Sequence, residues 1–197
     1  MTHAHSRHAV IPTPIGNLTL VASGVALTGV YFARHWPKPD ASQFGERVPA
    51  DSDEQLASTA RQLDEYFAGE RTSFDLPIAT HGDLFQERVW AILREIQFGE
   101  ATTYGDLAHR LGDRSLARDV GQAVGRNSLS IVVPCHRVVG KDGSLVGYAG
   151  GLERKRALLE REGWHLLPKR GRANLRDLTI GRDAPSSQIP LLAGVGG

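Results

Sequence analysis

Alternating hydrophobic and polar positions near the N-terminus predict a β-hairpin. Leu18, Leu20 and Ala22 fall on alternate positions, and a second apolar segment covers residues 27–32. Alternation with a period of two is typical of a strand with one buried face. Gly24 lies between the two segments, where a turn is needed. The chain is therefore expected to begin with a small antiparallel sheet.

A helical pattern follows the predicted hairpin. Apolar residues spaced three and four apart form one face of this helix, at Leu56, Ala60, Leu63 and Phe67. Ser52 and Gln55 have the spacing of a capping box at its start, and Gly69 is placed to end it. We interpret residues 1–80 as a small α/β domain that supports the rest of the chain.

Helical patterns also dominate the next eighty residues. A capping box at Asp83–Gln86 begins the first helix. Two shorter helices are expected at residues 104–110, where Thr103 can cap the start, and at residues 115–124. Gly112 lies between the two short helices, which is the outline of a helix-turn-helix. Many such helix pairs only pack against each other. Small residues in the second helix, among them Gly121, nevertheless indicate that something approaches its backbone closely.

The predicted fold class is a two-domain α+β or α/β protein. Residues 1–80 form the sheet-and-helix domain, and residues 81–165 form a mainly helical, winged-helix-like domain that contains the helix-turn-helix. Residues 166–197 contain several prolines and glycines with little periodicity, so they are expected to be a disordered tail.

Composition limits the classes of function. The net charge is only +1, so any affinity for nucleic acid must come from a local patch. Such a patch is available from four arginines, Arg110, Arg114, Arg118 and Arg126. One cysteine excludes an internal disulfide and suits a reducing cytoplasm. No apolar run is long enough to span a membrane, so no membrane partner is expected.

The single cysteine lies in the apolar run Ile131–Val139. Such a run is typical of a buried strand or of the approach to a buried turn, and Pro134 would end a strand at that point. A lone cysteine is often just a small buried hydrophobe. Cys135 is followed by His136, however, and a thiol becomes a nucleophile where a base can help to remove its proton.

The neighbouring motifs carry a specific resemblance. They are Gly125-Arg126-Asn127, Val133-Pro134-Cys135-His136-Arg137-Val138, Gly147-Tyr148-Ala149-Gly150-Gly151-Leu152, and Leu158-Leu159 followed by Glu162-Gly163. Together they resemble the active-site region of the O6-alkylguanine-DNA alkyltransferases. The resemblance covers residues 125–163, extends more weakly through Phe85 into the N-terminal domain, and does not reach the last thirty or so residues.

The resemblance implies an activity and a partner. Such a protein flips O6-alkylguanine out of double-stranded DNA and transfers the alkyl group irreversibly to its own cysteine, here Cys135, once per molecule. The resemblance also permits O4-alkylthymine as a second substrate lesion. No cofactor is implied, and no metal, because members with zinc bind it through N-terminal cysteines that this chain lacks. A monomer is expected, while the preferred alkyl size and cooperative binding to DNA stay open.

The resemblance also assigns catalytic roles. Cys135 is the nucleophile, His136 its base through a bridging water, and Glu162 the acid that orients the imidazole. Asn127 braces the cysteine turn, and Tyr104 supports the leaving guanine by a hydrogen bond or a proton. Each residue has a simpler structural explanation, such as a surface charge for Glu162 or a core position for Tyr104.

Further residues are implied for binding. Arg118 fills the space of the flipped base, from a helix that lies in the minor groove. Other contacts to DNA are expected from Ala117, Gly121, Arg114 and Arg126. The guanine pocket corresponds to Val146, Gly147, Tyr148, Ala149 and Gly150, with Lys155 near the substrate oxygen. One departure stands out: Ser128 replaces the proline that usually follows the family asparagine, which would loosen the turn that aims Asn127.

Three alternatives fit parts of the sequence. A lesion-binding relative without catalysis would lack the nucleophile that Cys135 supplies. A helix-turn-helix regulator would not need a cysteine, a histidine and a glutamate in register. A cysteine hydrolase would show continued turnover on an ester substrate, and normally takes its histidine from a distant strand.

Overall fold

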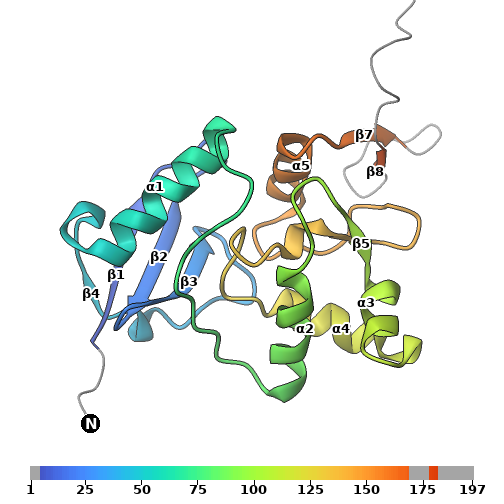
Figure 1. Ribbon diagram of the computed structural model, residues 1–197, viewed down its shortest axis with the longest axis horizontal. Helices are drawn as coiled ribbons and strands as arrows, with labels where there is room; N and C mark the ends of the chain where they lie inside the picture. Colours follow the sequence, from blue (N-terminus) through green and yellow to red (C-terminus); the bar gives the residue numbers. More distant parts are fainter. Residues whose placement is uncertain (1–4, 169–177, 182–197) are drawn as a thin grey trace, which may run out of the picture.

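The structure divides into a sheet-and-helix half and a helical half (Figure 1). It is a computed structural model, which describes residues 5–168 and 178–181. No helix among these residues has the length and apolar content needed to cross a membrane.

A four-stranded sheet forms the first half. Its strands are β1 (Ser6–Ile11), β2 (Leu18–Ser23), β3 (Ala26–Phe32) and β4 (Glu46–Arg47). The order is β3-β2-β1-β4, in which β4 runs parallel to β1 and the other neighbours are antiparallel. The predicted hairpin is confirmed as β2 and β3. Helix α1 (Glu54–Ala68) crosses one face of the sheet (Figure 1).

The start of α1 differs from the prediction. The side chain of Asp53, not Ser52, accepts the hydrogen bond from the backbone N–H of Leu56, at 3.0 Å. Ser52 instead closes a short 3-10 turn, in which its hydroxyl donates to the carbonyl of Pro49 at 2.7 Å. Asp53 has the extended backbone of an N-cap and is also held by Arg7, whose Nε lies 2.6 Å from its carboxylate.

Among the described residues, four helices and several short strands build the second half. The helices are α2 (Leu84–Arg94), α3 (Tyr104–Arg110), α4 (Ala117–Gly125) and α5 (Leu152–Arg161). Strands β5 (Thr102–Thr103) and β6 (Val138–Val139) pair in parallel. The capping box at Asp83–Gln86 is confirmed by both of its bonds, and Thr103 caps α3 as expected. The two-domain α+β class is thus confirmed.

The second helix of the predicted helix-turn-helix begins later than expected. Asp113 accepts from the backbone N–H of Ser115 at 2.8 Å and so caps a 3-10 turn, Arg114–Leu116. The α-helix starts only after this turn, at Ala117. Two short helices joined by a glycine turn are nevertheless present, because Gly112 has the left-handed φ of 101° that the turn requires.

Part of the expected disordered tail is ordered. Strand β7 (His165–Pro168) pairs antiparallel with β8 (Leu178–Gly181). The N–H of Leu145 donates to Leu178, and Ile180 packs against a small buried cluster that includes Leu159. Apolar residues spaced two apart give these short strands one face to bury, so the prediction of disorder from residue 166 is wrong for them. The rest of that segment, 169–177 and 182–197, lies outside the described residues.

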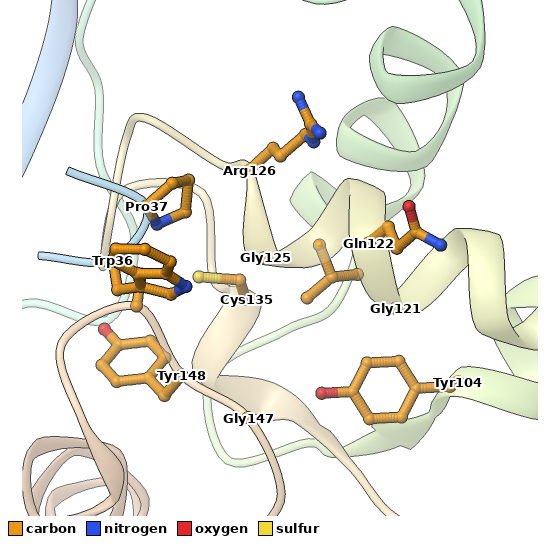
Figure 2. A pocket seen from close by; sticks show the side chains of 12 residues that line it. Trp36, Pro37, Tyr104, Gly121, Gln122, Gly125, Arg126, Cys135, Gly147 and Tyr148 are labelled. Atoms are coloured by element: carbon orange, nitrogen blue, oxygen red, sulfur yellow. The ribbon is translucent and has the colours of Figure 1, made fainter. Parts of the chain in front are cut away.

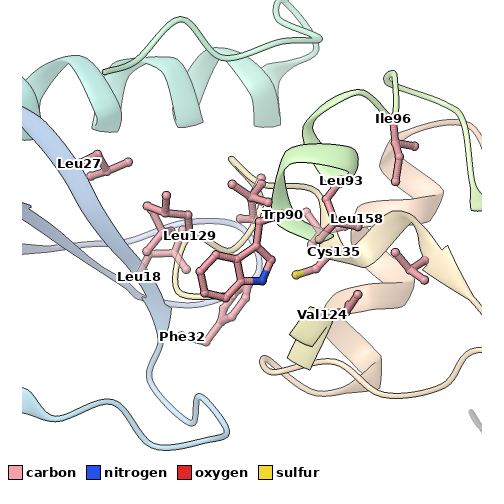
Figure 3. Packing of buried hydrophobic residues seen from close by; sticks show 14 of the residues in the cluster. Leu18, Leu27, Phe32, Trp90, Leu93, Ile96, Val124, Leu129, Cys135 and Leu158 are labelled. Atoms are coloured by element: carbon pink, nitrogen blue, oxygen red, sulfur yellow. The ribbon is translucent and has the colours of Figure 1, made fainter. Parts of the chain in front are cut away.

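One hydrophobic core crosses the division between the halves. It runs from the sheet through α1 and α2 to Cys135 and α5. Trp90 of α2 lies between the sheet and the cysteine (Figure 3), and its Nε1 donates to the carbonyl of Ala123 at 2.8 Å. Val30 of β3 exchanges backbone hydrogen bonds with Ser128 and Ser130. The sheet therefore helps to position the segment that leads to the cysteine.

Candidate functional site

Cys135 follows a tight buried turn. Of the two alternatives for this run, the structure has the turn and not the strand, because Val133 donates back to the carbonyl of Leu129 at 2.8 Å. Ile131, fully buried, adopts a left-handed φ of 73°, which is rare for a β-branched residue. Cys135 then begins the 3-10 turn Cys135–Arg137 and is almost entirely buried.

Asn127 holds this turn together with three hydrogen bonds. Its Nδ2 donates to the carbonyl of Val133 at 2.9 Å and to Sγ of Cys135 at 3.1 Å. Its Oδ1 accepts from the N–H of Leu129 at 3.0 Å. The bracing contact expected of Asn127 is thus present. The turn lacks the family proline, but the carbonyl of Ser128 is fixed by the N–H of Val30 at 2.8 Å.

His136 and Glu162 form a fully buried pair. Nε2 of His136 lies 2.9 Å from Oε1 of Glu162, and Arg137 donates to both carboxylate oxygens from Nε and Nη2, at 2.8 and 2.9 Å. Burial alone would raise the pKa of Glu162, but hydrogen bonds and charge from His136 and Arg137 outweigh it and hold the pKa at about 2. The carboxylate therefore stays charged, and Nε2 carries the proton of the imidazole.

The other ring nitrogen of His136 is thereby left as an acceptor. Nδ1 is buried and has no hydrogen-bond partner among the described residues. Burial lowers the pKa of His136, and the charges of Arg137 and Lys155 add to this, while Glu162 opposes it. A neutral imidazole with a bare Nδ1 can take up a proton.

Two further donors to Glu162 were missed by sequence reasoning. The hydroxyl of Tyr66, in α1, donates to Oε1 at 2.9 Å, and the N–H of Gly99 donates to Oε2 at 3.3 Å. Tyr66 follows Leu63 on the apolar face of α1 and is fully buried. A polar tip on that face was the available signal, because a buried tyrosine hydroxyl needs a partner.

The thiol is protonated at rest. Burial raises the pKa of Cys135, while the hydrogen bond from Asn127 and the positive charge of Lys155 act against this rise. Nζ of Lys155 donates to the carbonyls of Val138 and Val146 at 2.6 Å and of Gly147 at 3.0 Å. These three bonds use all the donors of an ammonium group, so Lys155 holds the pocket wall and does not offer a proton to a substrate oxygen.

A cavity of about 470 Å³ opens beside the sulfur (Figure 2). Its size is in the range of small-molecule sites. The lining residues are Trp36, Pro37, Tyr104, Gly121, Gln122, Val124, Gly125, Arg126, Cys135, Gly147, Tyr148 and Ala149. Trp36, Pro37 and Tyr148 stand on one side of the sulfur, and Tyr104 and helix α4 on the other (Figure 2). Sequence reasoning included neither Trp36 nor Pro37.

The residues expected around guanine have different surroundings. The hydroxyl of Tyr104 donates to the carbonyl of Val146 at 3.3 Å, and burial together with the charge of a Cys135 thiolate raises its pKa to about 12. A Cβ on Gly121 would meet the Tyr104 ring at an ordinary 3.7 Å, so packing does not demand glycine there. A Cβ on Gly150 would lie 2.4 Å from the ring of Phe32, so packing against the sheet explains this glycine.

The predicted arginines lie on the outer surface of α4 and the turn before it. Arg114, Arg118 and Arg126 are all exposed, and Arg126 reaches the rim of the cavity. Ala117 is half-buried and packs against the core. Arg110 pairs instead with Glu95. Three of the four basic side chains are thus exposed on or next to α4, the helix that lines the cavity.

Fold and site together define a protein that combines a helix-turn-helix domain with a buried cysteine, histidine and glutamate beside a cavity that can hold a small molecule. Two family models match the chain. Residues 6–80 match the ribonuclease-like domain of 6-O-methylguanine DNA methyltransferase, and residues 84–164 match its DNA-binding domain. The chain belongs to the 6-O-methylguanine DNA methyltransferase family.

Individual relatives agree with this assignment. A methylated-DNA–protein-cysteine methyltransferase of Mycobacterium bovis is 43% identical over 155 residues, covering 79% of this chain and 91% of the relative. A crystal structure of Mycobacterium tuberculosis OGT in complex with DNA is 41% identical, with a TM-score of 0.73 over 79% of this chain and 92% of that one. The Methanococcus jannaschii O6-methylguanine DNA methyltransferase is 30% identical, with a TM-score of 0.57 over 84% and 99%.

Proposed function

We propose that this chain repairs O6-alkylguanine in double-stranded DNA by moving the alkyl group to Sγ of Cys135. One observation carries the proposal: the sulfur faces a cavity of about 470 Å³ while Asn127 donates to it and His136 is oriented by a buried Glu162. The names of the relatives support the same class of reaction, since they are methylated-DNA–protein-cysteine methyltransferases.

The thiol is activated through His136. With Nε2–H donated to Glu162, Nδ1 can accept the proton of Cys135 through one bridging water. The resulting imidazolium is stabilised by the carboxylate beside it, and the thiolate by Asn127 and the nearby Lys155 charge. Activation therefore needs no cofactor.

The transfer is a displacement at carbon. The thiolate attacks the alkyl carbon, a carbon–sulfur bond forms, and the bond from that carbon to O6 of guanine breaks. The electron pair stays on guanine, which is neutralised by a proton. Tyr104 donates a hydrogen bond to the leaving base, since its raised pKa keeps the hydroxyl protonated at neutral pH. The proton that guanine gains is balanced by the one that His136 took from Cys135. A thioether does not hydrolyse under these conditions, so each molecule acts once.

DNA reaches the site along α4. The exposed Arg114 and Arg126, on either side of α4, contact phosphates, and the absence of a side chain at Gly121 lets the strand approach the cavity. The target nucleotide must leave the stack to reach a buried sulfur, and Arg118 fills its place. Residues 1–80 support the catalytic part, residues 81–165, and a reducing compartment such as the cytoplasm keeps the thiol available.

Intact-mass analysis tests the proposal. Incubation with a duplex containing one O6-methylguanine should add one methylene to the protein mass, at most once per molecule, with the modification on the peptide that contains Cys135. The Cys135→Ala variant should gain no mass yet still bind the duplex, because phosphate contacts lie on α4. Mass gain in this variant would refute the mechanism.

A further inference from the structure

The N-terminal half contributes an exposed aromatic side chain to the cavity. Trp36 follows β3 and has 76% of its surface exposed, although apolar side chains of this size are usually covered. It lines the cavity together with Cys135 and Tyr148 (Figure 2). The other two tryptophans, Trp90 and Trp164, both pack within the protein.

The backbone at Trp36 is anchored to the cavity wall. The N–H of Trp36 donates to the carbonyl of Ala149 at 2.9 Å, and the N–H of His35 donates to the carbonyl of Phe32 at 3.0 Å. Phe32 packs edge-on against Tyr148, with ring centroids 5.7 Å apart. The backbone that carries the indole is therefore fixed to the wall that lines the cavity.

A planar aromatic ligand fits this arrangement. An exposed indole at the mouth of an apolar cavity offers a flat face, and nucleobases stack on such faces irrespective of their sequence. Cys135 and Trp36 both line the cavity, and the Cys135 side chain points toward the indole in Figure 2, so a group attached to a base and directed at the sulfur passes close to Trp36.

We propose that Trp36 is a substrate-binding residue supplied by the N-terminal half, whose indole contacts the alkylated base in the cavity. This inference rests on the proposed function. The N-terminal half, described above as a support, would then also determine how tightly the substrate binds and which alkyl groups the cavity accepts.

Reaction with free O6-benzylguanine tests the proposal, because a free base involves no contact with the DNA strand. Trp36→Ala should slow the transfer to Cys135 roughly tenfold or more, the loss expected for one stacked base. Trp36→Phe should retain most of the rate. Val25→Ala is the matched control, since Val25 is 80% exposed in the same half and lies outside the cavity lining. Melting curves show whether each variant is folded.

The outcomes separate this inference from the proposed function. If the unmodified chain transfers benzyl to Cys135 and Trp36→Ala reacts equally fast, Trp36 is not a substrate contact, whereas the proposed function stands. A loss on duplex DNA alone would also overturn the inference, because Trp36 would then touch the strand and not the base. Absence of transfer in the unmodified chain from both the free base and an O6-methylguanine duplex would overturn both.

Fluorescence gives a second measurement that does not depend on the reaction. In Cys135→Ser, which cannot accept the benzyl group as a stable thioether, O6-benzylguanine should quench the emission of Trp36. The same titration of Cys135→Ser with Trp36→Phe should show no quenching, although calorimetry still detects binding. Quenching that persists would come from Trp90 or Trp164 and would contradict the contact.

Discussion

Glu162 accepts hydrogen bonds from His136, Arg137, Tyr66 and Gly99 while its side chain is shielded from water. Its pKa of about 2 is below the usual 4.5, so its ionised form stabilises the fold. This contribution is complete above about pH 4.5 and is lost as the pH falls toward 2. The shift corresponds to about 3 kcal/mol.

The first prediction concerns this carboxylate. Glu162→Gln should slow single-turnover transfer at neutral pH and move the rise of the rate to higher pH. Without its anionic partner His136 is a weaker base, so the Cys135 thiol loses its proton only at higher pH. It should also lower the free energy of unfolding by about 3–5 kcal/mol, since the buried Arg137 is left without a counter-charge. Rate–pH profiles and urea titrations measure both effects.

A neighbouring glutamate provides the control for this prediction. Glu160 lies on the same helix, is 42% exposed and pairs with Arg156 across one helical turn. Glu160→Gln should leave the rate unchanged and alter the free energy of unfolding by less than about 1 kcal/mol. If Glu162→Gln behaves in the same way, the orienting role of Glu162 is wrong.

Among the secondary-structure elements, α4 presents two different faces. Val120, Ala123 and Val124 are buried against the rest of the helical half, while Arg118 and Gln122 face outward. The cavity opens between this helix and the turn with Cys135. A helix in this position can contact phosphates and guide a flipped nucleotide at the same time.

Arg118→Ala should therefore reduce repair of duplex DNA far more than reaction with a free alkylated base. A free base needs no extrusion, so a side chain that only fills the stack has no role with it. Parallel single-turnover assays on duplex DNA and on the free base measure the loss of rate on each substrate. Arg156→Ala, which removes a half-exposed arginine from α5, is the comparison and should affect neither. Equal losses of rate on both substrates in Arg118→Ala would mean that Arg118 supports the fold.

Local signals predicted most elements of this fold. The caps at Asp83 and Thr103 and the hairpin of β2 and β3 depend on residues close in sequence, and all are confirmed. The contacts of Tyr66 and Trp36 join parts of the chain about a hundred residues apart, as with Tyr66 and Glu162. Neither the periodicity of apolar residues nor the spacing of local motifs predicts contacts between such distant residues. The positions of Cys135, His136 and Glu162 came from family motifs, which preserve long-range geometry.

On the scale of the whole molecule, the two halves are joined at the site itself. The Tyr66 hydroxyl of α1 reaches Glu162 behind the cysteine, and the backbone of Val30 pairs with the segment 128–130. Cooperative unfolding is expected where a core is shared in this way. The protein should therefore unfold in one transition even though it has two domains.

Tyr66→Phe tests this coupling. The change keeps the buried ring but removes one hydrogen bond to a charged group, which contributes about 1.5–3 kcal/mol. The whole transition should move to lower denaturant. In a background with Trp36→Phe and Trp164→Phe, the midpoint should be the same by far-UV circular dichroism and by the fluorescence of Trp90 in the helical half. Separate midpoints for the two probes would show that the halves unfold independently.

The sulfur of Cys135 lies in the same packed cluster as the leucines of both halves (Figure 3). Repair would thus add carbon at the border between this packed cluster and the cavity, where an alkyl group that presses on the cluster strains it. Extra volume in a packed core typically costs about 1–3 kcal/mol. A spent molecule would then unfold more often than a fresh one. Proteases that cleave transiently open chains could remove it selectively, without any receptor for the modified cysteine.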